Sequence, residues 1–275
     1  MSSPPPLLPS LELVRRSVAA ELAYTVSRLQ VVERKPGNPY GVAIRHLEDG
    51  ATALMARRIP VPHFNTVVGL RIGHETQIEG LAAWYREGGV SGRFELVPGL
   101  HDEKLGRALH EAGYFHSGFH VSLLSEATRT ASPLPAETTI ELVIEEAQID
   151  DFFDAYWRGW NFQHGGREDF KANVRGWRGL PGWSLYLARV DGKPAATAAL
   201  FMHEGVGYCA DAAVDPAFRG RGLQRTLLTR RIADAASAGA DFVCSGAEFL
   251  SPSHRNMAGI GMRMQFTRAV WTKAA

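Results

Sequence analysis

The predicted fold is decided by residues 214–228, which read Val-Asp-Pro-Ala-Phe-Arg-Gly-Arg-Gly-Leu-Gln-Arg-Thr-Leu-Leu. The stretch begins as the apolar end of a strand, turns at a proline and passes through a glycine loop with two arginines into an amphipathic helix. Apolar residues continue at helical spacing after the loop, at Leu223, Leu227, Leu228, Ile232 and Ala236. We expect Gly239 to cap this helix at its C-terminus.

The glycine loop, residues 219–222, has the composition of an anion-binding site. Backbone amides in the first turn of a helix lack intrahelical partners, and the helix dipole places partial positive charge there. Gly220 and Gly222 permit positive φ and a close approach of the ligand, while Arg219 and Arg221 can add charge-assisted contacts. A pyrophosphate is therefore the expected ligand.

The spacing of the loop excludes two common phosphate loops, because neither Gly-x-x-x-x-Gly-Lys-Ser/Thr nor Gly-x-Gly-x-x-Gly is present. It resembles the Arg/Gln-x-x-Gly-x-Gly/Ala loop of the GNAT superfamily of N-acetyltransferases. Arg219 is the first residue of the pattern, Gly222 the central glycine, and Gln224 departs from the final small residue.

The surrounding elements have the order that this resemblance implies. Alternation and apolar runs predict strands at 183–190, 195–203, 206–214, 242–247 and 262–271. A tight turn is expected at 191–194, and a helix from Ser251 and Pro252. The last strand is expected to carry one face of apolar residues, Met262, Met264, Phe266 and Val270. The resemblance covers about residues 138–273, roughly half of the chain.

The segment before residue 138 predicts a second domain. Small residues and prolines without periodicity indicate a linker at 131–137. Before it we expect helices at 11–31, 78–87 and 102–112 and strands at 64–70, 94–97 and 114–124. The pair Gly113-Tyr114 repeats the pattern of Gly261-Met262, but residues 69–74 lack the spacing of the glycine loop.

These observations predict an α/β (α+β) fold with a mixed, mostly antiparallel GNAT-type sheet flanked by helices. We expect two tandem GNAT-like domains. Residues 1–130 form a degenerate one that has lost its cofactor site, and residues 138–275 form a GNAT acetyltransferase domain with the acyl-CoA site.

Composition excludes several classes of partner. A formal net charge of +1 over 275 residues does not suggest nucleic acid or a membrane surface. The two cysteines, Cys209 and Cys244, fall in predicted core strands, which favours free thiols and a cytoplasmic location. Residues 1–9 are proline-rich and predicted to be disordered, and no signal peptide or 18-residue apolar span is expected. A homodimer is left open.

The resemblance implies acetyl-CoA, or another acyl-CoA, as co-substrate. In the family, the pantetheine arm pairs with the strand before the loop at a bulge, which here would use Ala212, Ala213 and Val214. The alanines equally fit a crowded core. The resemblance assigns the pyrophosphate to Arg219, Gly220, Arg221, Gly222, Leu223 and Gln224. It assigns the pantetheine also to Asn256, but residues 257–265 contain no Tyr, His or acid, so protonation of the thiolate falls to water or another residue.

The general base has three candidates. Where some family members have a glutamate, this sequence has Tyr208, and the nearby acids are Asp211 and Glu248. Tyr208 and Asp211 alternate to opposite faces of a regular strand unless a bulge resets the register. Each acid could equally be a solvated or salt-bridged carboxylate. A backbone amide near Ala213 could stabilise the oxyanion.

The acceptor is the least defined part of the prediction. Residues 156–164, Tyr-Trp-Arg-Gly-Trp-Asn-Phe-Gln-His, are the most aromatic stretch, and could bind an amine by stacking or simply pack a helix on the sheet. His116 and His120 are expected to be ordinary histidines, so no metal is predicted.

The leading hypothesis is an acyl-CoA-dependent N-acetyltransferase that acts by direct transfer in a ternary complex on a small-molecule or protein amine. The alternatives are a non-catalytic acyl-CoA-binding or sensing protein and an interaction module that binds another anion.

Overall fold

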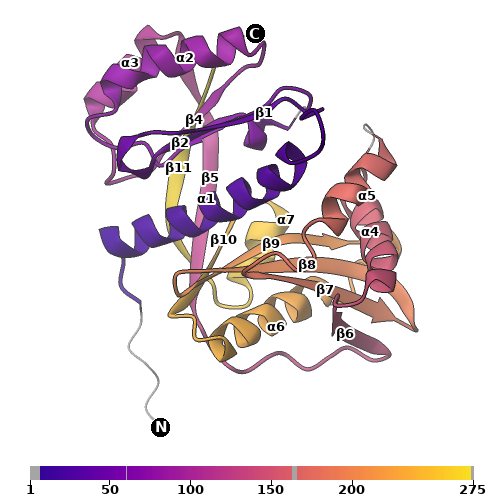
Figure 1. Cartoon of the computed structure of the whole chain (residues 1–275). Helices are drawn as coiled ribbons and strands as arrows, with labels where there is room; N and C mark the ends of the chain where they lie inside the picture. Colours follow the sequence, from indigo (N-terminus) through magenta and orange to yellow (C-terminus); the bar gives the residue numbers. More distant parts are fainter. Residues whose placement is uncertain (1–6, 60, 163–165, 274–275) are drawn as a thin grey trace. The chain divides into compact units, whose positions relative to one another are not determined.

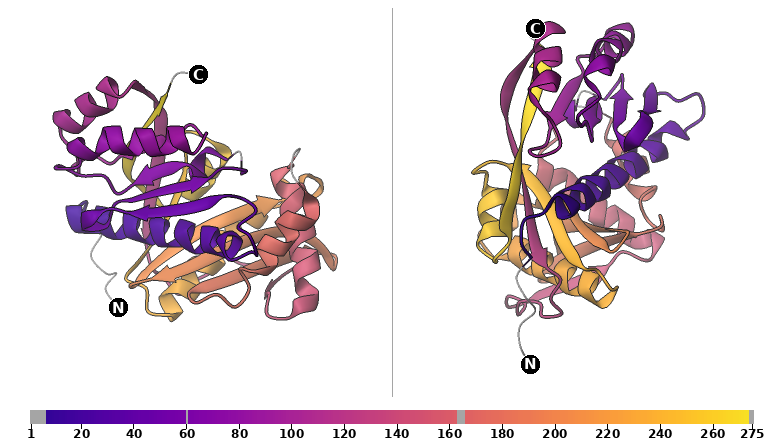
Figure 2. Two further views of the ribbon diagram at one scale, coloured as in Figure 1. Left: turned by 45° about the horizontal axis from the view of Figure 1, so that its top comes forward. Right: turned by 90° about the vertical axis from the view of Figure 1, so that its left-hand side faces the viewer.

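The computed structural model describes residues 7–59, 61–162 and 166–273, which contacts divide into two compact units (Figure 1). Unit 1 contains Leu123–Gly246 and Pro252–Arg263, together with the N-terminal residues up to Leu8. Unit 2 contains Pro9–Ser122, Ala247–Ser251 and the chain from Met264 onward. In Figures 1 and 2 the last strand, in yellow, lies among the purple N-terminal elements of the unit to which most of it belongs.

Unit 1 is built around the strands that precede and follow the glycine loop. In chain order its elements are β6 (Thr138–Leu142), α4 (Glu146–Trp160), α5 (Arg167–Arg175), β7 (Trp183–Val190), β8 (Lys193–His203), β9 (Val206–Val214), η4 (Pro216–Phe218), α6 (Leu223–Ser237), β10 (Phe242–Glu248) and α7 (Pro252–Ala258). The strands lie in the order β10-β9-β8-β7-β6, and β10 is parallel to β9 while the other neighbours are antiparallel.

The turn between β7 and β8 is shorter than predicted, because only Asp191 and Gly192 lie between the paired residues Val190 and Lys193. Both loop residues have positive φ, 50° and 75°, as a two-residue hairpin turn of the primed type requires. The expected strands 183–190 and 206–214 coincide with β7 and β9.

Unit 2 contains the remaining elements. They are α1 (Leu11–Glu33), β1 (Val42–His46), η1 (Glu48–Gly50), β2 (Thr52–Ala56), η2 (Pro62–Phe64), β3 (Thr66–Val68), η3 (Glu75–Gln77), α2 (Ile78–Glu87), β4 (Arg93–Leu96), α3 (Glu103–Glu111), β5 (Tyr114–Glu126) and β11 (Arg263–Lys273). Its strands lie in the order β1-β2-β3-β4-β11-β5, with β3 parallel to β4. The last residues of β5 and the first of β11 are grouped with unit 1.

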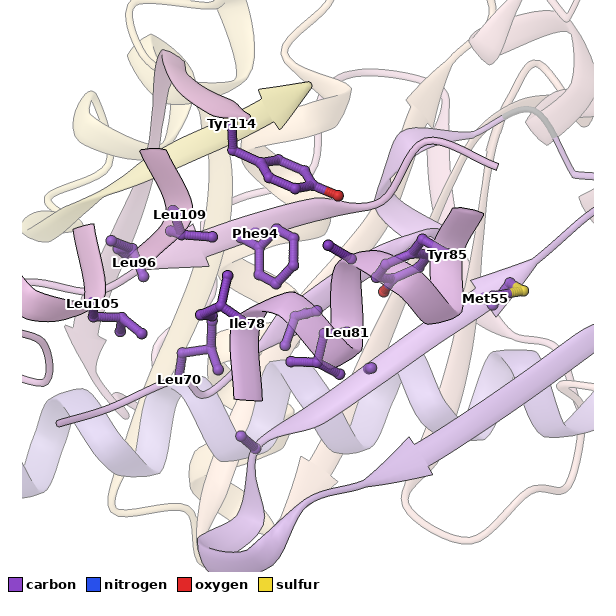
Figure 3. Close-up of a cluster of buried hydrophobic side chains, with 14 residues drawn as sticks. Met55, Leu70, Ile78, Leu81, Tyr85, Phe94, Leu96, Leu105, Leu109 and Tyr114 are labelled. Carbon is purple, nitrogen blue, oxygen red and sulfur yellow. The ribbon is translucent and has the colours of Figure 1, made fainter. Parts of the chain in front are cut away.

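Two layers of helix cover the sheet of unit 2. On one face, α2 and α3 pack over β2 and β4 in the apolar core of Figure 3, where Phe94 meets the ring of Tyr114 edge-on at 4.7 Å between centroids. The hydroxyl of Tyr85 donates to the carbonyl of Leu54 at 2.8 Å, so this buried polar group is satisfied. On the other face α1 packs, with Leu29 and Val32, over Val42 of β1 and over Leu54 and Ala56 of β2, which alternate with the β2 residues of the first face.

The two halves of the chain repeat one topology. In unit 2, β3 leads through α2 to the parallel strand β4, and then through α3 to β5. In the second half, β9 leads through α6 to the parallel strand β10, and then through α7 to β11. Gly113 and Gly261, which precede β5 and β11, both have positive φ, 84° and 96°. The predicted mixed, mostly antiparallel architecture with two tandem GNAT-like halves is confirmed.

Some sequence predictions were wrong in detail. Strands β1 and β2 were missed, because β2 is an alanine-containing segment buried at every residue and shows no alternation. The strand expected at 64–70 is only Thr66–Val68. Met264 is 55% exposed and does not share a buried face with Phe266, whereas Arg268 on the same alternation is 1% exposed.

Each of the two units contains segments from several parts of the chain. The predicted domains, in contrast, are the consecutive segments 1–130 and 138–275. Strand β11 is grouped with unit 2 because it pairs with β4, at Ala269↔Leu96 and the two following positions. The predicted linker at 131–137 and the domain limits at 130 and 138 remain a prediction about independently folding segments.

Candidate functional site

Strand β9 carries a bulge at Asp211, three residues before its end. Ala199 pairs with Ala210, and Thr197 pairs with Ala213, so β9 has one more residue than β8 in this interval. Asp211 absorbs the extra residue with a φ of 48°, a left-handed conformation that is uncommon for residues other than glycine. The bulge breaks the regular alternation between Tyr208 and Asp211. Two side chains that a regular strand would place on opposite faces can therefore serve one site.

Shortly before the bulge β9 also separates from its other neighbour, β10. The parallel ladder to β10 runs from Val206↔Phe242 to Tyr208↔Cys244, and no later pair is present in the described part of the chain. The hydroxyl of Ser245 donates to the carbonyl of Cys209 at 2.7 Å, at the point where the ladder ends. The backbone of residues 210–214 therefore has an edge at which an extended ligand could add as a strand.

The glycine loop follows this edge directly. Gly220 and Gly222 both have a φ of 77°, and Gly222 is the N-cap of α6. A Cβ atom added at either glycine would meet nothing within 4 Å, so the space in front of the loop is open. No side chain caps α6. In the described part of the chain, the amides of residues 220–224 donate to no backbone carbonyl outside α6. Several amides at the N-terminus of α6 are thus available to an anion.

Two arginines and one carboxylate hold the loop in place. Arg219 donates from Nε to the carbonyl of Val214 at 3.3 Å and from Nη2 to the carbonyl of Gly159 at 3.2 Å. The guanidinium of Arg221 lies 5.7 Å from the ring centre of Phe218. Asp215 accepts from the amide of Ala217 at 3.0 Å, and this contact shapes the turn into the loop.

Asp215 is a charged anchor at the start of the loop. Burial raises the pKa of this carboxyl, but the hydrogen bonds from Arg158 and from the amide of Ala217 outweigh it, and the pKa lies below its ordinary value. Nε of Arg158, on α4, lies 2.5 Å from the Asp215 carboxylate. The pair ties the loop to the last turn of α4.

Two of the predicted ligand-binding residues contact each other. Nδ2 of Asn256, on α7, donates to Oε1 of Gln224 at 2.5 Å. Nη1 of Arg225 donates to the carbonyl of Gly259 at 3.3 Å, which further joins the start of α6 to the end of α7. Gln224, the residue that departs from the family pattern, therefore orients the Asn256 amide.

The three candidate bases lie in different surroundings. Tyr208 is buried in the paired part of β9, while Asp211 lies in the bulge and accepts from the hydroxyl of Tyr156 at 3.3 Å. Glu248, the last residue of β10, is exposed and is grouped with unit 2. Asp211 is the candidate whose position the bulge determines.

The structure adds Arg231, which the sequence analysis missed. This side chain of α6 is 2% exposed, and its Nη1 donates to the carbonyls of Ala199 and Ala210, at 2.9 and 3.1 Å. These two residues form the last pair before the bulge, so Arg231 satisfies carbonyls where the ladder changes register. A signal was present in the sequence, because Arg231 continues the apolar i, i+4 stripe of Leu223 and Leu227.

The equivalent loop of unit 2 is occupied by groups of its own. The amide of Arg71 donates to Nδ1 of His74 at 3.1 Å, and the amide of Gly73 donates to the carboxylate of Glu75 at 2.9 Å. The amide of Ile72 donates to the carbonyl of Leu100 at 2.9 Å. Because these amides already have acceptors, they are not available to a pyrophosphate.

The aromatic stretch divides into buried and exposed rings. Phe152, Phe153 and Tyr156 of α4 are buried, whereas Trp160 at the end of the helix is 50% exposed. Asn161 ends the helix in the left-handed conformation. Gln163 and His164 lie outside the described residues.

Other expectations concern thiols, metals and membranes. Cys209 and Cys244 are free and buried, as predicted, and burial raises the pKa of the Cys209 thiol. The described residues include no group of three or more His, Cys, Asp or Glu side chains that could hold a metal ion. None of the helices in the described ranges combines the length and apolarity needed to cross a membrane.

A bulged strand that separates from its parallel neighbour and leads through a glycine loop into a helix defines a GNAT-type acyltransferase domain. Residues 125–249, a little under half of the chain, match the family described as "Acetyltransferase (GNAT) domain". The match supports acyl transfer as the general class of reaction. A search of curated proteins gave no significant match.

Solved structures of the same fold cover both halves of the chain. The chain is similar to a GCN5-related N-acetyltransferase from Kribbella flavida, with 17% identity, a TM-score of 0.63 and coverage of 94% of this chain and 96% of that one. A GCN5-related N-acetyltransferase from Sphaerobacter thermophilus has 16% identity, a TM-score of 0.63 and coverage of 94% and 91%. A tandem GNAT protein from the clavulanic acid biosynthesis pathway has 13% identity, a TM-score of 0.62 and coverage of 92% and 95%. At such identities the likeness shows the fold alone.

Proposed function

We propose that the protein is an N-acetyltransferase that transfers an acetyl group from acetyl-CoA, or from another acyl-CoA, to an amine by direct transfer in a ternary complex. The observation that carries the proposal is the open glycine loop, with unpartnered amides at the start of α6, directly after the bulged edge of β9. The family match of residues 125–249 supports it. The acceptor is a small-molecule or protein amine, and the buried free thiols support a cytoplasmic location.

The residues of unit 1 fit an acyl-CoA. The backbone edge of Ala212, Ala213 and Val214 is suited to the pantetheine arm, as a strand partner that offers main-chain groups. We assign the pyrophosphate to Arg219, Gly220, Arg221, Gly222, Leu223 and Gln224. Asn256 would add a side-chain contact to the pantetheine once the Gln224 amide moves away from it.

The co-substrate supplies an acyl group activated as a thioester. We assign Asp211 as the base that accepts the proton of the attacking amine, because the bulge and Tyr156 hold its carboxylate beside the strand edge. The amine nitrogen bonds to the acyl carbon, the carbon–sulfur bond breaks, and water protonates the thiolate, since residues 257–265 contain no Tyr, His or acid. An amide near Ala213 would stabilise the oxyanion. Tyr208 and Glu248 remain the alternative groups for proton transfer.

The cofactor site can be tested at Gly222. We expect Gly222→Glu to abolish binding of acetyl-CoA, because the new side chain meets the anion in the open space and places a carboxylate against it. In a thermal-shift titration, acetyl-CoA at 100 times its Kd should stabilise the unchanged protein by about 2.7 kcal/mol. A suitable control is Gly239→Glu, because Gly239 also has positive φ, 84°, and open space around it, but lies at the other end of α6. Full binding by Gly222→Glu would show that the anion site is elsewhere.

A second experiment separates an enzyme from a sensor. Release of free CoA thiol is measured with acetyl-CoA and a library of amines, using the unchanged protein and Asp211→Asn. The proposal expects amine-dependent release that the variant reduces by at least about 100-fold, the low end of what a general base contributes. Binding of acetyl-CoA without release for any amine would favour the non-catalytic alternative.

A further inference from the structure

The last turn of α4 brings aromatic rings to the bulge of β9. A Cβ atom on Gly159 would lie 2.7 Å from the Cβ atom of Ala213 and 3.0 Å from the amide nitrogen of Val214, so the helix touches the strand through a bare glycine. One turn earlier, Tyr156 reaches the Asp211 carboxylate with its hydroxyl. The aromatic residues of this turn are therefore adjacent to the strand edge assigned to the acyl group.

The rings form a packed cluster with one open side. Tyr156 has its ring centre 6.3 Å from that of Trp160 and 5.8 Å from that of Phe162, and the latter two are 6.4 Å apart. Tyr156 is buried, Phe162 is half-buried, and Trp160 is 50% exposed. Since one of the largest apolar side chains of unit 1 leaves half of its surface in solvent at this place, it can receive a ligand.

The ring spacing decides how a ligand can bind. An ammonium held between two rings lies within about 6 Å of each ring centre. The two rings must therefore be far enough apart to leave space for it. The three rings here are already in contact with one another at 5.8–6.4 Å. A ligand must therefore stack on the outer face of Trp160, which favours a flat group over a caged ammonium.

The charges on α4 and α5 argue against a polycationic ligand. The carboxylates of α4 are engaged by arginines and a lysine: Glu146 by Arg175 and Arg178, Asp150 by Lys171, Asp151 by Arg189 and Asp154 by Arg167. Asp215 is likewise paired with Arg158. These paired carboxylates attract additional ammonium groups less strongly than free ones would.

We infer that the acceptor is an amine joined by a short chain to an aromatic ring, with the ring stacked on Trp160 and the amine directed to Asp211. The inference rests on the proposed function and adds to it the chemical class of the acceptor. Tyr156 acts in this arrangement as a positioning residue, because its hydroxyl holds the Asp211 carboxylate while its ring supports Trp160.

The test compares two monoamines of equal charge and similar length, one aromatic and one saturated, and adds a polyamine. Thiol release from acetyl-CoA is measured with 2-phenylethylamine, with its saturated analogue 2-cyclohexylethylamine, and with spermidine. We expect kcat/KM for 2-phenylethylamine to exceed that for the saturated analogue by about 2- to 10-fold, the range that ring–ring contacts provide, and spermidine to be the poorest. A preference for 2-cyclohexylethylamine or spermidine, or no turnover of 2-phenylethylamine, overturns the inference.

Variants locate the effect at the ring. Trp160→Ala should raise KM for 2-phenylethylamine by a similar factor, with no change in kcat or in the Kd of acetyl-CoA, and Trp160→Phe should restore most of the loss. Phe119→Ala, which removes a 54% exposed ring of unit 2, is the matched control and should change neither quantity. An unchanged KM in Trp160→Ala contradicts the inference but leaves the proposed function standing. Absence of acetyl-CoA binding in the unchanged protein overturns the proposed function itself.

Discussion

Arg268 lies at the centre of a buried charge network in unit 2. Its guanidinium donates to the carboxylates of Glu21, at 2.5 Å, and Glu95, at 2.7 Å, and all three side chains are almost completely buried. Arg93 also bonds to Glu95. Burial would lower the pKa of Arg268, but the two carboxylates raise it above its ordinary value. The network joins α1, β4 and β11, which are far apart in the sequence.

Removing this arginine should be costly. We expect Arg268→Met to lower the free energy of unfolding by about 3–5 kcal/mol, because it removes the cation that Glu21 and Glu95 share and leaves Glu95 with Arg93 alone. Arg263→Met is the matched control on the same strand, since Arg263 is half exposed and its pair with Glu126 is worth less than about 1 kcal/mol. Urea denaturation measures both, and equal losses in the two variants would contradict the role of the network.

His63 makes stability depend on pH. Burial lowers the pKa of its imidazole from 6.5 to about 4, against the opposing effect of Glu95 and Glu21. The unfolded chain therefore binds a proton between pH 6.5 and 4 that the folded protein does not, and stability falls as the pH decreases through this window. Burial also raises the pKa of Glu95, but Arg268 and Arg93 dominate and lower it from 4.5 to about 2, so the stability that Glu95 contributes is lost only below pH 4.5.

We expect the loss from His63 between pH 6.5 and 4 to be about 1–2 kcal/mol. The full shift would correspond to roughly 3 kcal/mol, but the side chain keeps part of its surface in solvent. His63→Gln can keep the hydrogen bond to Thr25 and should remove this part of the pH dependence. Urea denaturation at pH 7, 5.5 and 4.5 compares the slopes, and parallel curves for the two proteins would refute the assignment.

At the scale of elements, the bulge of β9 depends on a side chain from another element. Arg231 supplies the donors for two strand carbonyls at the register change, and it donates from Nε to the carbonyl of Leu227 in its own helix, at 3.1 Å. A donor from another element is needed because a bulge leaves backbone carbonyls without their regular partners on the neighbouring strand.

Replacing Arg231 should therefore affect both fold and ligand. We expect Arg231→Met to lower the free energy of unfolding by about 1–3 kcal/mol, as buried carbonyls lose their donor, and to weaken acetyl-CoA binding. Arg230→Met, which removes only the partly exposed pair with Asp234 on the same helix, should cost less than about 1 kcal/mol and leave binding unchanged. Urea denaturation and calorimetric titration give the two quantities. Unaltered affinity in Arg231→Met would show that the bulge does not need this donor.

Elements with strong local signals could be predicted from the sequence. The helix at 78–87 and the strands β7 and β9 were predicted with the observed limits, because period, turn residues and glycines mark them locally. Strand β2 was missed since burial on both faces removes alternation, and with it its partner β1. In the candidate site the glycine loop was predictable from its spacing. The contacts of Arg231 and of Tyr156 with β9 were not, because they depend on how residues distant in the sequence pack together.

At the scale of the whole molecule, the C-terminal strand completes the unit formed by the N-terminal residues. Strand β11 pairs with β4 and carries Phe266 and Arg268 into the interior of unit 2. We expect removal of residues 264–275 to increase backbone hydrogen exchange throughout 9–122 and much less in 138–246. A chain that lacks only residues 274–275 keeps β11 whole and is the control. Increased exchange confined to 138–246 would instead support a second domain that extends to the end of the chain.

The pairing of β4 with β11 also sets the order in which the protein can be built. Glu95 and Arg268 are 173 residues apart in the sequence, and most other elements are synthesised between them. During translation the N-terminal residues leave the ribosome first, yet their sheet lacks an inner strand until β11 has emerged. The nascent N-terminal half must therefore wait with an unpaired strand edge, the kind of exposed edge that chaperones protect and that aggregation exploits.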